Sequence, residues 1–282
     1  MINFRSVDDM NQLIKAKLHT IPNVDCIIGV PRSGMLPATL IALYLGKPLI
    51  SIEQLGLGSQ SNQFTNRIPL NNLTIKKALV VDDSCFSGNA MNKVREYLKP
   101  YNDIQFIYSA IYVTSASINK IDLYFDIVEQ WRVWEWNIMD HLILESSCVD
   151  LDGILCVDPT YEQNDDSDIY LDFLCNATPK FIPTHKIKAI VTCRFEKYRM
   201  ETELWLKKHN VKYNKLYMMN LPTMFDRQRL GHYGEYKGRI YNQTGASLFI
   251  ESNPKEAEEI NLFTGKPVYC LNNGKFYKEI TC

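Results

Sequence analysis

Two adjacent carboxylates, Asp82 and Asp83, follow the apolar run 78–81 and precede the small-residue segment 84–89. The apolar run is typical of a buried strand, and the residues after it have the spacing of a helix. In an open α/β sheet, ligands gather at the carboxyl ends of the strands, and the N–H groups that begin a helix bind phosphate. Because a carboxylate only accepts hydrogen bonds, two of them suit the two donors of a furanose diol. The pattern therefore predicts a site for a phosphorylated ribose.

This stretch resembles the signature of type I phosphoribosyltransferases. The resemblance implies that Asp82 and Asp83 bind the 2- and 3-hydroxyls of phosphoribosyl pyrophosphate (PRPP), while the following loop wraps its 5-phosphate. The residues implied for that loop are Ser84, Cys85, Phe86, Ser87, Gly88 and Asn89. Taken without the resemblance, a strand that ends in a solvated Asp-Asp turn explains the same residues.

A second unit of strand, turn and helix lies upstream, with a branched apolar strand at 26–30, a turn at 31–34 and a helix pattern at 36–45. In the resembled family this turn binds the leaving diphosphate. The resemblance implies that Arg32 supplies a fixed cation, and that Ser33 and Gly34 let the backbone approach the ligand. A plain connection between strand and helix is the alternative interpretation.

Two further stretches of the first half are candidates for ligand contact. Residues 53–68 are polar and without period, which predicts a mobile loop, and the resemblance makes it a lid over PRPP with Arg67 near the diphosphate. If residues 130–136 form a strand, Trp134 and Trp136 share one face and Trp131 lies on the other. Those rings either stack on the acceptor or pack at a domain junction.

The second half contains Asp150-Leu151-Asp152-Gly153 after an apolar strand pattern. This motif resembles the first motif of the haloacid dehalogenase superfamily of phosphatases. Three further pieces follow in that family's order. They are Thr192 after the strand at 187–191, Lys237, and Glu251 at the end of the strand at 248–250.

The resemblance implies a covalent phosphatase mechanism. Asp150 attacks phosphorus to form an aspartyl phosphate, and Asp152 protonates the leaving alkoxide and later deprotonates water. Thr192 and Lys237 hold the phosphoryl oxygens. The implied Mg²⁺ ligands are Asp150, the carbonyl of Asp152 and Glu251, a glutamate where the superfamily usually has aspartate.

These motifs predict an α/β protein of two doubly wound domains. Residues 1–141 are expected to form a type I phosphoribosyltransferase-like domain with a parallel sheet of about five strands, opened by a capped helix after Ser6. Residues 142–282 are expected to form a Rossmann-like domain similar to the haloacid dehalogenases. Its insert at 158–183 is too short for a large cap, which predicts a minimal cap and an open site.

Composition narrows the class of protein. The chain has 282 residues, 46% of them hydrophobic, and a formal net charge of -1. That balance predicts a globular protein without general attraction to nucleic acid. No apolar run reaches the roughly 20 residues of a membrane span, and the amino terminus has no signal-peptide core, so a cytoplasmic location is expected.

Together the two resemblances imply a bifunctional enzyme. Ribose 5-phosphate is transferred from PRPP to a glycan, and the 5-phosphate is then removed to leave a β-ribofuranoside. The arrangement resembles the fused transferase and phosphatase proteins of bacterial polysaccharide biosynthesis. A lipid-linked acceptor would bring the enzyme to the inner membrane surface. The sequence identifies neither the acceptor, the linkage, a general base for transfer, nor the oligomeric state.

Two alternatives stay open. One is a nucleobase phosphoribosyltransferase fused to a 5-nucleotidase, in which the tryptophan face stacks a base. The other is a non-catalytic PRPP sensor. It is suggested by Ser84 and Ala90, where the transferase family usually has an apolar residue and a threonine, and by Glu251.

Overall fold

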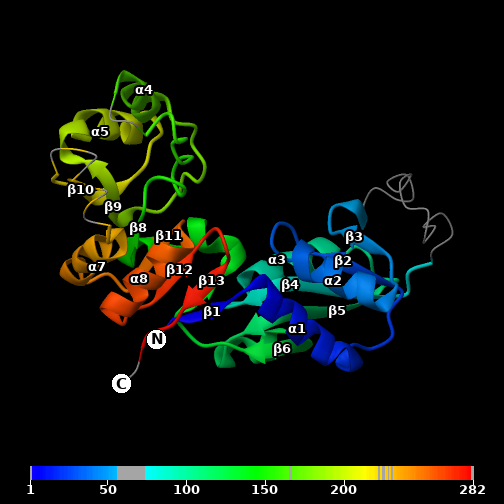
Figure 1. Ribbon diagram of the computed structural model, residues 1–282. Coiled ribbons are helices and arrows are strands. Elements are labelled where there is room, and N and C mark those ends of the chain that lie inside the picture. The colour runs from blue at the N-terminus through cyan, green and yellow to red at the C-terminus, as the bar shows by residue number, and fades with distance from the viewer. Residues whose placement is uncertain are drawn as a thin grey trace. The chain divides into compact units, whose positions relative to one another are not determined.

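The computed structural model describes residues 2–55, 74–164, 167–221, 223, 226–227, 229 and 231–280. The chain divides into two compact units, Met1–Trp136 and Asn137–Cys282, each built around its own sheet (Figure 1). Both units have helices and a sheet made mainly of parallel strands, so the predicted α/β class is confirmed.

The first unit has a five-stranded, all-parallel sheet in the order β3-β2-β4-β5-β6. The strands are β2 (Cys26–Gly29), β3 (Leu49–Ser51), β4 (Lys77–Cys85), β5 (Gln105–Val113) and β6 (Leu123–Ile127). All four residues of β2 are buried, as the apolar pattern predicts for a strand covered on both faces. The predicted strand count is therefore confirmed.

Three helices cover this sheet: α1 (Val7–Lys17), α2 (Met35–Leu45) and α3 (Asn89–Leu98). Buried side chains of α1 and α2 belong to one apolar cluster, whereas those of α3 belong to a second cluster. The unit is thus doubly wound. Ser6 caps α1 as predicted, since its hydroxyl accepts the Asp9 N–H at 3.0 Å and the Asp9 carboxylate accepts the Ser6 N–H at 2.8 Å.

A separate two-stranded ladder joins the ends of the first unit. β1 (Asn3–Arg5) pairs in parallel with β7 (Arg132–Trp134), which places the tryptophan segment beside the amino terminus. The unit's 3-10 helices lie at Leu18–Thr20 and Ser115–Lys120, and another at Glu135–Asp140 crosses the boundary between the units.

The second unit has a six-stranded sheet in the order β10-β9-β8-β11-β12-β13, in which only the pairing of β12 with β13 is antiparallel. Its strands are β8 (Ser147–Val149), β9 (Ile187–Phe195), β10 (Tyr213–Met219), β11 (Leu248–Glu251), β12 (Val268–Cys270) and β13 (Lys275–Tyr277). Its helices are α4 (Asp168–Asn176), α5 (Arg199–Lys208), α7 (Tyr233–Thr244) and α8 (Pro254–Thr264), with 3-10 helices at Leu142–Ser146 and Glu196–Tyr198.

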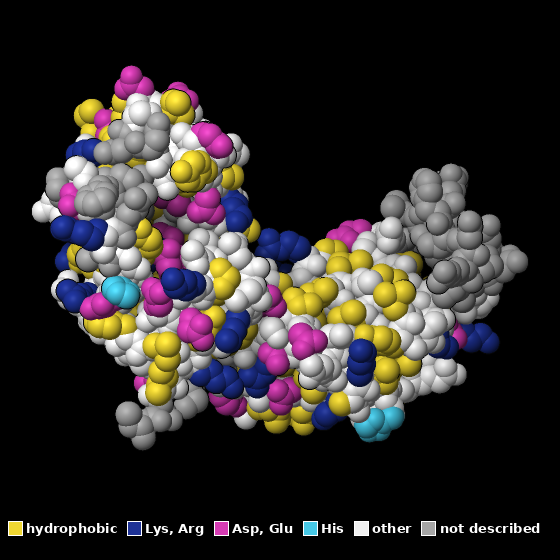
Figure 2. Space-filling view, viewed as in Figure 1, with side chains coloured by type: hydrophobic (Ala, Val, Ile, Leu, Met, Phe, Trp, Pro, Cys, Tyr) yellow, Lys and Arg dark blue, Asp and Glu magenta, His cyan; other side chains and the backbone are white. Residues whose placement is uncertain are grey.

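Trp205 of α5 is buried, and its indole N–H donates to the Ala177 carbonyl at 2.8 Å, so this tryptophan belongs to the core. No helix among the described residues is long and apolar enough to cross a membrane. On the face shown in Figure 2, Lys and Arg side chains are interspersed with Asp and Glu side chains, in keeping with the small net charge.

Candidate active sites

β4 is longer than its apolar core predicts. The strand runs on through Asp82 and Asp83 to Cys85, because it stays paired with β5 as far as the register of Cys85 with Val113. The acids therefore lie within the strand and not after it. Ser84 and Cys85 also belong to the strand, so the connection to α3 is only 86–88.

The acid pair is buried, with Asp82 8% exposed and Asp83 4% exposed. The Asp83 N–H donates to Asp82 Oδ1 at 2.8 Å, and the Trp136 indole N–H donates to Asp83 Oδ2 at 2.7 Å. Burial, and next the charge of Asp83, raises the pKa of Asp82 to about 8. The Asp82 carboxyl is therefore protonated near neutral pH, and it can donate a hydrogen bond to a ligand.

The short loop after β4 is held in place by Gly88 and Lys120. Gly88 has φ 78°, and a Cβ there would lie 2.6 Å from Lys120 Cδ. Lys120 Nζ donates to the Ser87 carbonyl at 2.7 Å, which fixes the loop ahead of α3. Asn89 begins α3, so the first N–H groups and the positive end of the helix dipole face this loop.

The predicted diphosphate loop meets the acid pair at Gly34. A Cβ at Gly34 would lie 2.6 Å from the Val30 carbonyl oxygen, 2.7 Å from that of Val81 and 2.9 Å from Asp82 Cα. Only glycine allows these backbones to come so close. Arg32 is exposed and Ser33 is half-buried in the same turn, whose Pro31–Arg32 peptide bond is cis.

The structure thus brings the two predicted loops of the first unit together at the carboxyl ends of β2 and β4. The predicted lid is not testable in the same way, because residues 56–68, including Arg67, lie outside the described residues.

The strand considered for residues 130–136 is shorter in the structure, because β7 ends at Trp134 and Trp136 lies in a 3-10 helix. The rings of Trp134 and Trp136 still lie together, stacked at 5.7 Å with only 7° between their planes. Trp134 is 5% exposed and stacks on the buried Tyr112 at 4.8 Å, so it is a core residue without a free face. Trp131 is exposed.

Phe86 offers an accessible aromatic face near the acids. Its side chain is 52% exposed, and the Arg132 guanidinium carbon lies 4.9 Å from its ring centre. Arg132 also approaches the Cys85 carbonyl, at 3.5 Å from Nη1.

The second unit gathers four charged side chains at the carboxyl ends of β8 and β11. Lys237 Nζ lies 2.8 Å from Asp150 Oδ2, 2.7 Å from Glu251 Oε2 and 2.7 Å from Glu256 Oε2. Burial and the charge of Glu251 raise the pKa of Asp150 well above its usual range. Although burial opposes it, the charges of Asp150 and Glu251 raise the pKa of Lys237.

Asp152 is fixed by a partner that the sequence did not reveal. Arg194 Nη2 donates to Asp152 Oδ1 at 2.6 Å and its Nε donates to Oδ2 at 3.0 Å. Arg194 is 1% exposed. One feature of the sequence could have indicated Arg194 as a site residue. It lies two residues after Thr192 on one strand, so both side chains lie on the same face of the sheet.

The glycine of the motif at residues 150–153 is required for steric reasons. Gly153 has φ 78°, and a Cβ there would lie 2.4 Å from Ser252 Oγ. Ser252 Oγ in turn donates to the Asp152 carbonyl at 3.3 Å. The turn after β8 therefore packs directly on the turn after β11.

A cavity of about 180 Å³ opens over this cluster. Its walls include all the site residues predicted for the second unit: Asp150, Asp152, Thr192, Lys237 and Glu251. They also include Arg227 and Asn164, which are joined by a hydrogen bond of 2.9 Å. Sequence reasoning missed both, because neither lies in a motif or a periodic segment.

The predicted metal ligands are only partly arranged for a cation. Among residues the structure describes, no three His, Cys, Asp or Glu side chains are grouped to hold a metal ion. The Asp152 side chain turns to Arg194, and the Lys237 ammonium lies between Asp150 and Glu251. The donor chemistry still fits a hard divalent cation, because three carboxylates surround a single ammonium.

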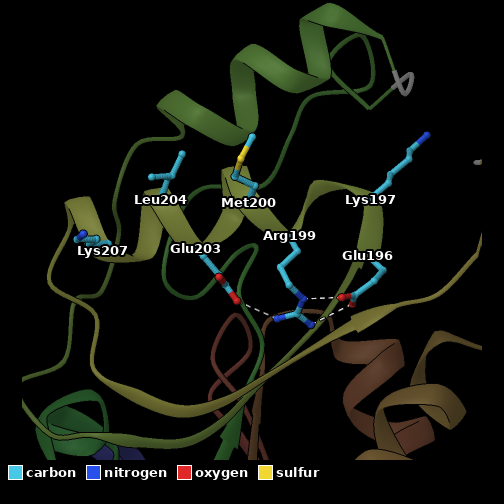
Figure 3. A pocket seen from close by; sticks show the side chains of 7 residues that line it. All are labelled: Glu196, Lys197, Arg199, Met200, Glu203, Leu204 and Lys207. Carbon is cyan, nitrogen blue, oxygen red and sulfur yellow. Dashed lines mark hydrogen bonds and ion pairs between the residues drawn. The ribbon is translucent and has the colours of Figure 1, made fainter.

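A larger depression of about 560 Å³ lies elsewhere on the second unit, along the 3-10 helix at Glu196–Tyr198 and α5 (Figure 3). Figure 3 shows Arg199 pointing toward Glu196 and Glu203, and its nitrogens lie 2.5 Å and 3.0 Å from their oxygens. These ion pairs are exposed and stabilise little. None of the predicted site residues lines this depression.

Comparison with known proteins assigns a family to the first unit. Residues 3–138 match the phosphoribosyl transferase domain family. This unit is a phosphoribosyl transferase domain, and its two loops and acid pair lie where ligands bind in open α/β sheets.

Among solved structures, a purine phosphoribosyltransferase from Pyrococcus horikoshii is 23% identical, with a TM-score of 0.36 over 48% of this chain and 93% of that one. The xanthine-guanine-hypoxanthine phosphoribosyltransferase of Helicobacter pylori is 18% identical, with a TM-score of 0.38 over 49% of this chain and 95% of that one. No curated protein matches the chain.

Proposed function

We propose that the chain is a bifunctional enzyme that transfers ribose 5-phosphate from PRPP to an acceptor and then removes the 5-phosphate. The observation that carries the proposal is the presence of two separate clusters of buried acids, one in each unit. Asp82 and Asp83 lie beside two ligand loops, whereas Asp150 lies beside Lys237 and Glu251 under a cavity.

In the first unit, the diol of the ribose binds the acid pair, and its 5-phosphate binds the N–H groups at the start of α3. The diphosphate lies along the turn that holds Arg32 and Ser33. Departure of diphosphate leaves positive charge at C1, and the acceptor hydroxyl attacks C1 from the opposite face. The hydroxyl loses its proton, which the departed diphosphate can take up, and the product is the β-ribofuranoside. The buried carboxylate of Asp83 stabilises that charge through the field of the site.

In the second unit, Asp150 attacks phosphorus, the P–O bond to the sugar breaks, and an aspartyl phosphate forms. Lys237 neutralises the phosphoryl oxygens as they approach. Asp152, oriented by Arg194, lies two residues on, where it can pass a proton to the leaving alkoxide and later take one from water.

Mg²⁺ is the cofactor that this chemistry needs, and Asp150, Glu251 and the carbonyl of Asp152 are the residues that would hold it. When bound, the ion supplies charge stabilisation for the phosphoryl group. Its carboxylate ligands are those that contact Lys237, so the ion and the ammonium share them.

A glycan is the acceptor for which transfer followed by phosphate removal gives a useful product. Removal of the phosphate from a nucleotide would undo salvage, whereas removal from a glycan-linked ribose completes a ribofuranosyl unit. One observation favours the nucleobase alternative. The half-exposed Phe86 ring near the acid pair is a surface on which a base would stack.

Two variants separate the activities. Asp83→Asn should weaken Mg²⁺-dependent PRPP binding and pyrophosphate release at least tenfold while phosphatase activity persists, because one carboxylate acceptor is lost from the sugar site. Asp150→Asn should abolish phosphate release and leave PRPP binding unchanged. Calorimetry and a phosphate-release assay measure both variants. Loss of both activities in either variant would contradict two independent sites.

A further inference from the structure

Trp136 makes the one side-chain hydrogen bond that the structure gives to the Asp83 carboxylate from outside the acid pair, among the described residues. The indole Nε1 and Asp83 Oδ2 are 2.7 Å apart, although the two residues are 53 positions apart in the chain. That distance is at the short end of the range for N–H···O hydrogen bonds, whose strength depends on the direction of the donor and the acceptor. The contact therefore selects one orientation of the Asp83 carboxylate.

The indole is itself held in place. Its ring stacks on Trp134 with 7° between the planes, and Trp134 stacks on Tyr112, whose side chain is wholly buried. Tyr112 comes from β5, next to β4 in the sheet. The direction of the N–H is thus set by the core and not by a flexible side chain.

Charged groups also act on Asp83. Asp82 is its neighbour on β4, and the charge of Arg132 on β7 reaches it. Arg132 is directed at Phe86 and the Cys85 carbonyl. Without Trp136, the Asp83 carboxylate would be free to turn toward that guanidinium and away from the sugar.

We propose that Trp136 is a positioning residue of the sugar site, whose indole N–H holds the Asp83 carboxylate in the orientation that accepts a ribose hydroxyl. The inference rests on the proposed transferase function. It adds a residue from outside both ligand loops, and it gives the aromatic stack a role in PRPP recognition.

The test compares two ligands by calorimetry with the full chain and Mg²⁺. PRPP carries the ribose diol, whereas pyrophosphate carries only the group bound by the turn with Arg32. Trp136→Phe keeps an aromatic ring and removes the N–H. It should raise the Kd for PRPP about tenfold and leave the Kd for pyrophosphate within about twofold.

Trp131→Phe is the matched control, since it changes an exposed tryptophan of the same segment that lies outside the stack, and it should leave both Kd values within about twofold of the wild type. In an Asp83→Ala background, Trp136→Phe should cost nothing further, because no side-chain acceptor is left for the indole N–H. If Trp136→Phe does not fold, Trp136→Tyr, which also lacks the indole N–H, provides the same comparison.

Equal weakening of PRPP and pyrophosphate by Trp136→Phe would show a merely structural residue and overturn the inference, as would unchanged PRPP binding. A wild-type chain that binds no PRPP would overturn the transferase proposal as well, and so the two failures are distinguishable.

Discussion

Asp82 and Asp83 lie side by side in a buried strand, and the physical consequence is that they cannot both be charged cheaply. Burial and the Asp83 charge raise the pKa of Asp82 to about 8, while Asp83 receives the indole N–H of Trp136. The pair is thus unequal before any ligand binds. Asp82 is a proton donor near neutral pH, and Asp83 Oδ2 accepts the indole N–H.

This inequality predicts a pH dependence of stability. The Asp82 carboxyl is protonated in the folded state up to about pH 8 but ionises near pH 4 when unfolded, so the free energy of unfolding should fall as pH rises through that window. Asp82→Asn removes the effect. Relative to the wild type, the free energy of unfolding of this variant should rise by about 4 kcal/mol between pH 5 and pH 8.

Urea denaturation of the chain at pH 5 and at pH 8, followed through the transition of the first unit, measures this difference. Asp103→Asn is the control, because it removes an exposed carboxylate from the same unit. A wild-type chain and an Asp82→Asn variant with parallel pH profiles would contradict the unequal pair.

In the second unit, buried acids are balanced by a buried cation, Lys237. It is 2% exposed among three carboxylates, so it offsets charge that burial would otherwise make costly. Its place was predictable from the motif order, whereas the contact of Glu256 was not, because that residue lies beyond the motif on α8.

At the scale of elements, β4 and the turn before α2 form the site by contact of backbone with backbone. Gly34→Ala would put a methyl group 2.6–2.9 Å from three backbone atoms that cannot rotate away. The turn and β4 must then separate. We expect a loss of about 1–3 kcal/mol of stability and at least tenfold weaker PRPP binding.

Gly46→Ala is the control for this prediction. Gly46 has φ 60°, and a Cβ added there would have no atom within 4 Å, so alanine strains the end of α2 without touching the site. It should lower the melting temperature and leave PRPP binding intact. Equal PRPP affinity in Gly34→Ala and the wild type would contradict a tight approach at Gly34.

The sequence was informative for elements with strong local signals. Apolar runs located β2 and β4, Ser6 located the start of α1, and the helix pattern at 36–45 located α2. It misplaced the end of β4, because aspartate is rare in strands and only pairing with β5 keeps residues 82–85 extended. It also misplaced Trp136, whose ring stacks by tertiary packing and not by strand alternation.

Contacts between distant residues explain the rest of what the sequence did not reveal. Trp136 with Asp83 and Arg194 with Asp152 join positions that no local pattern relates. Such partners orient the predicted acids, so motif reading finds the reacting groups and misses the residues that hold them in place.

At the scale of the molecule, the account depends on two compact units that each place buried acids at the carboxyl ends of parallel strands. The first unit is a phosphoribosyl transferase domain, and the second has a cavity lined by Asp150, Lys237 and further acids. A transferase alone would need only the first unit. In the proposed function, removal of the 5-phosphate is the reaction of the second unit.

The most direct measurement is phosphate release by the purified chain with Mg²⁺ from three substrates: an alkyl β-ribofuranoside 5-phosphate, nucleoside 5-monophosphates and ribose 5-phosphate. We expect the alkyl riboside to be hydrolysed most efficiently by kcat/KM, and Asp150→Asn to abolish its hydrolysis. Preference for the nucleotides would favour the nucleobase alternative. Absence of phosphate release from every substrate would contradict the bifunctional account and support a non-catalytic second unit.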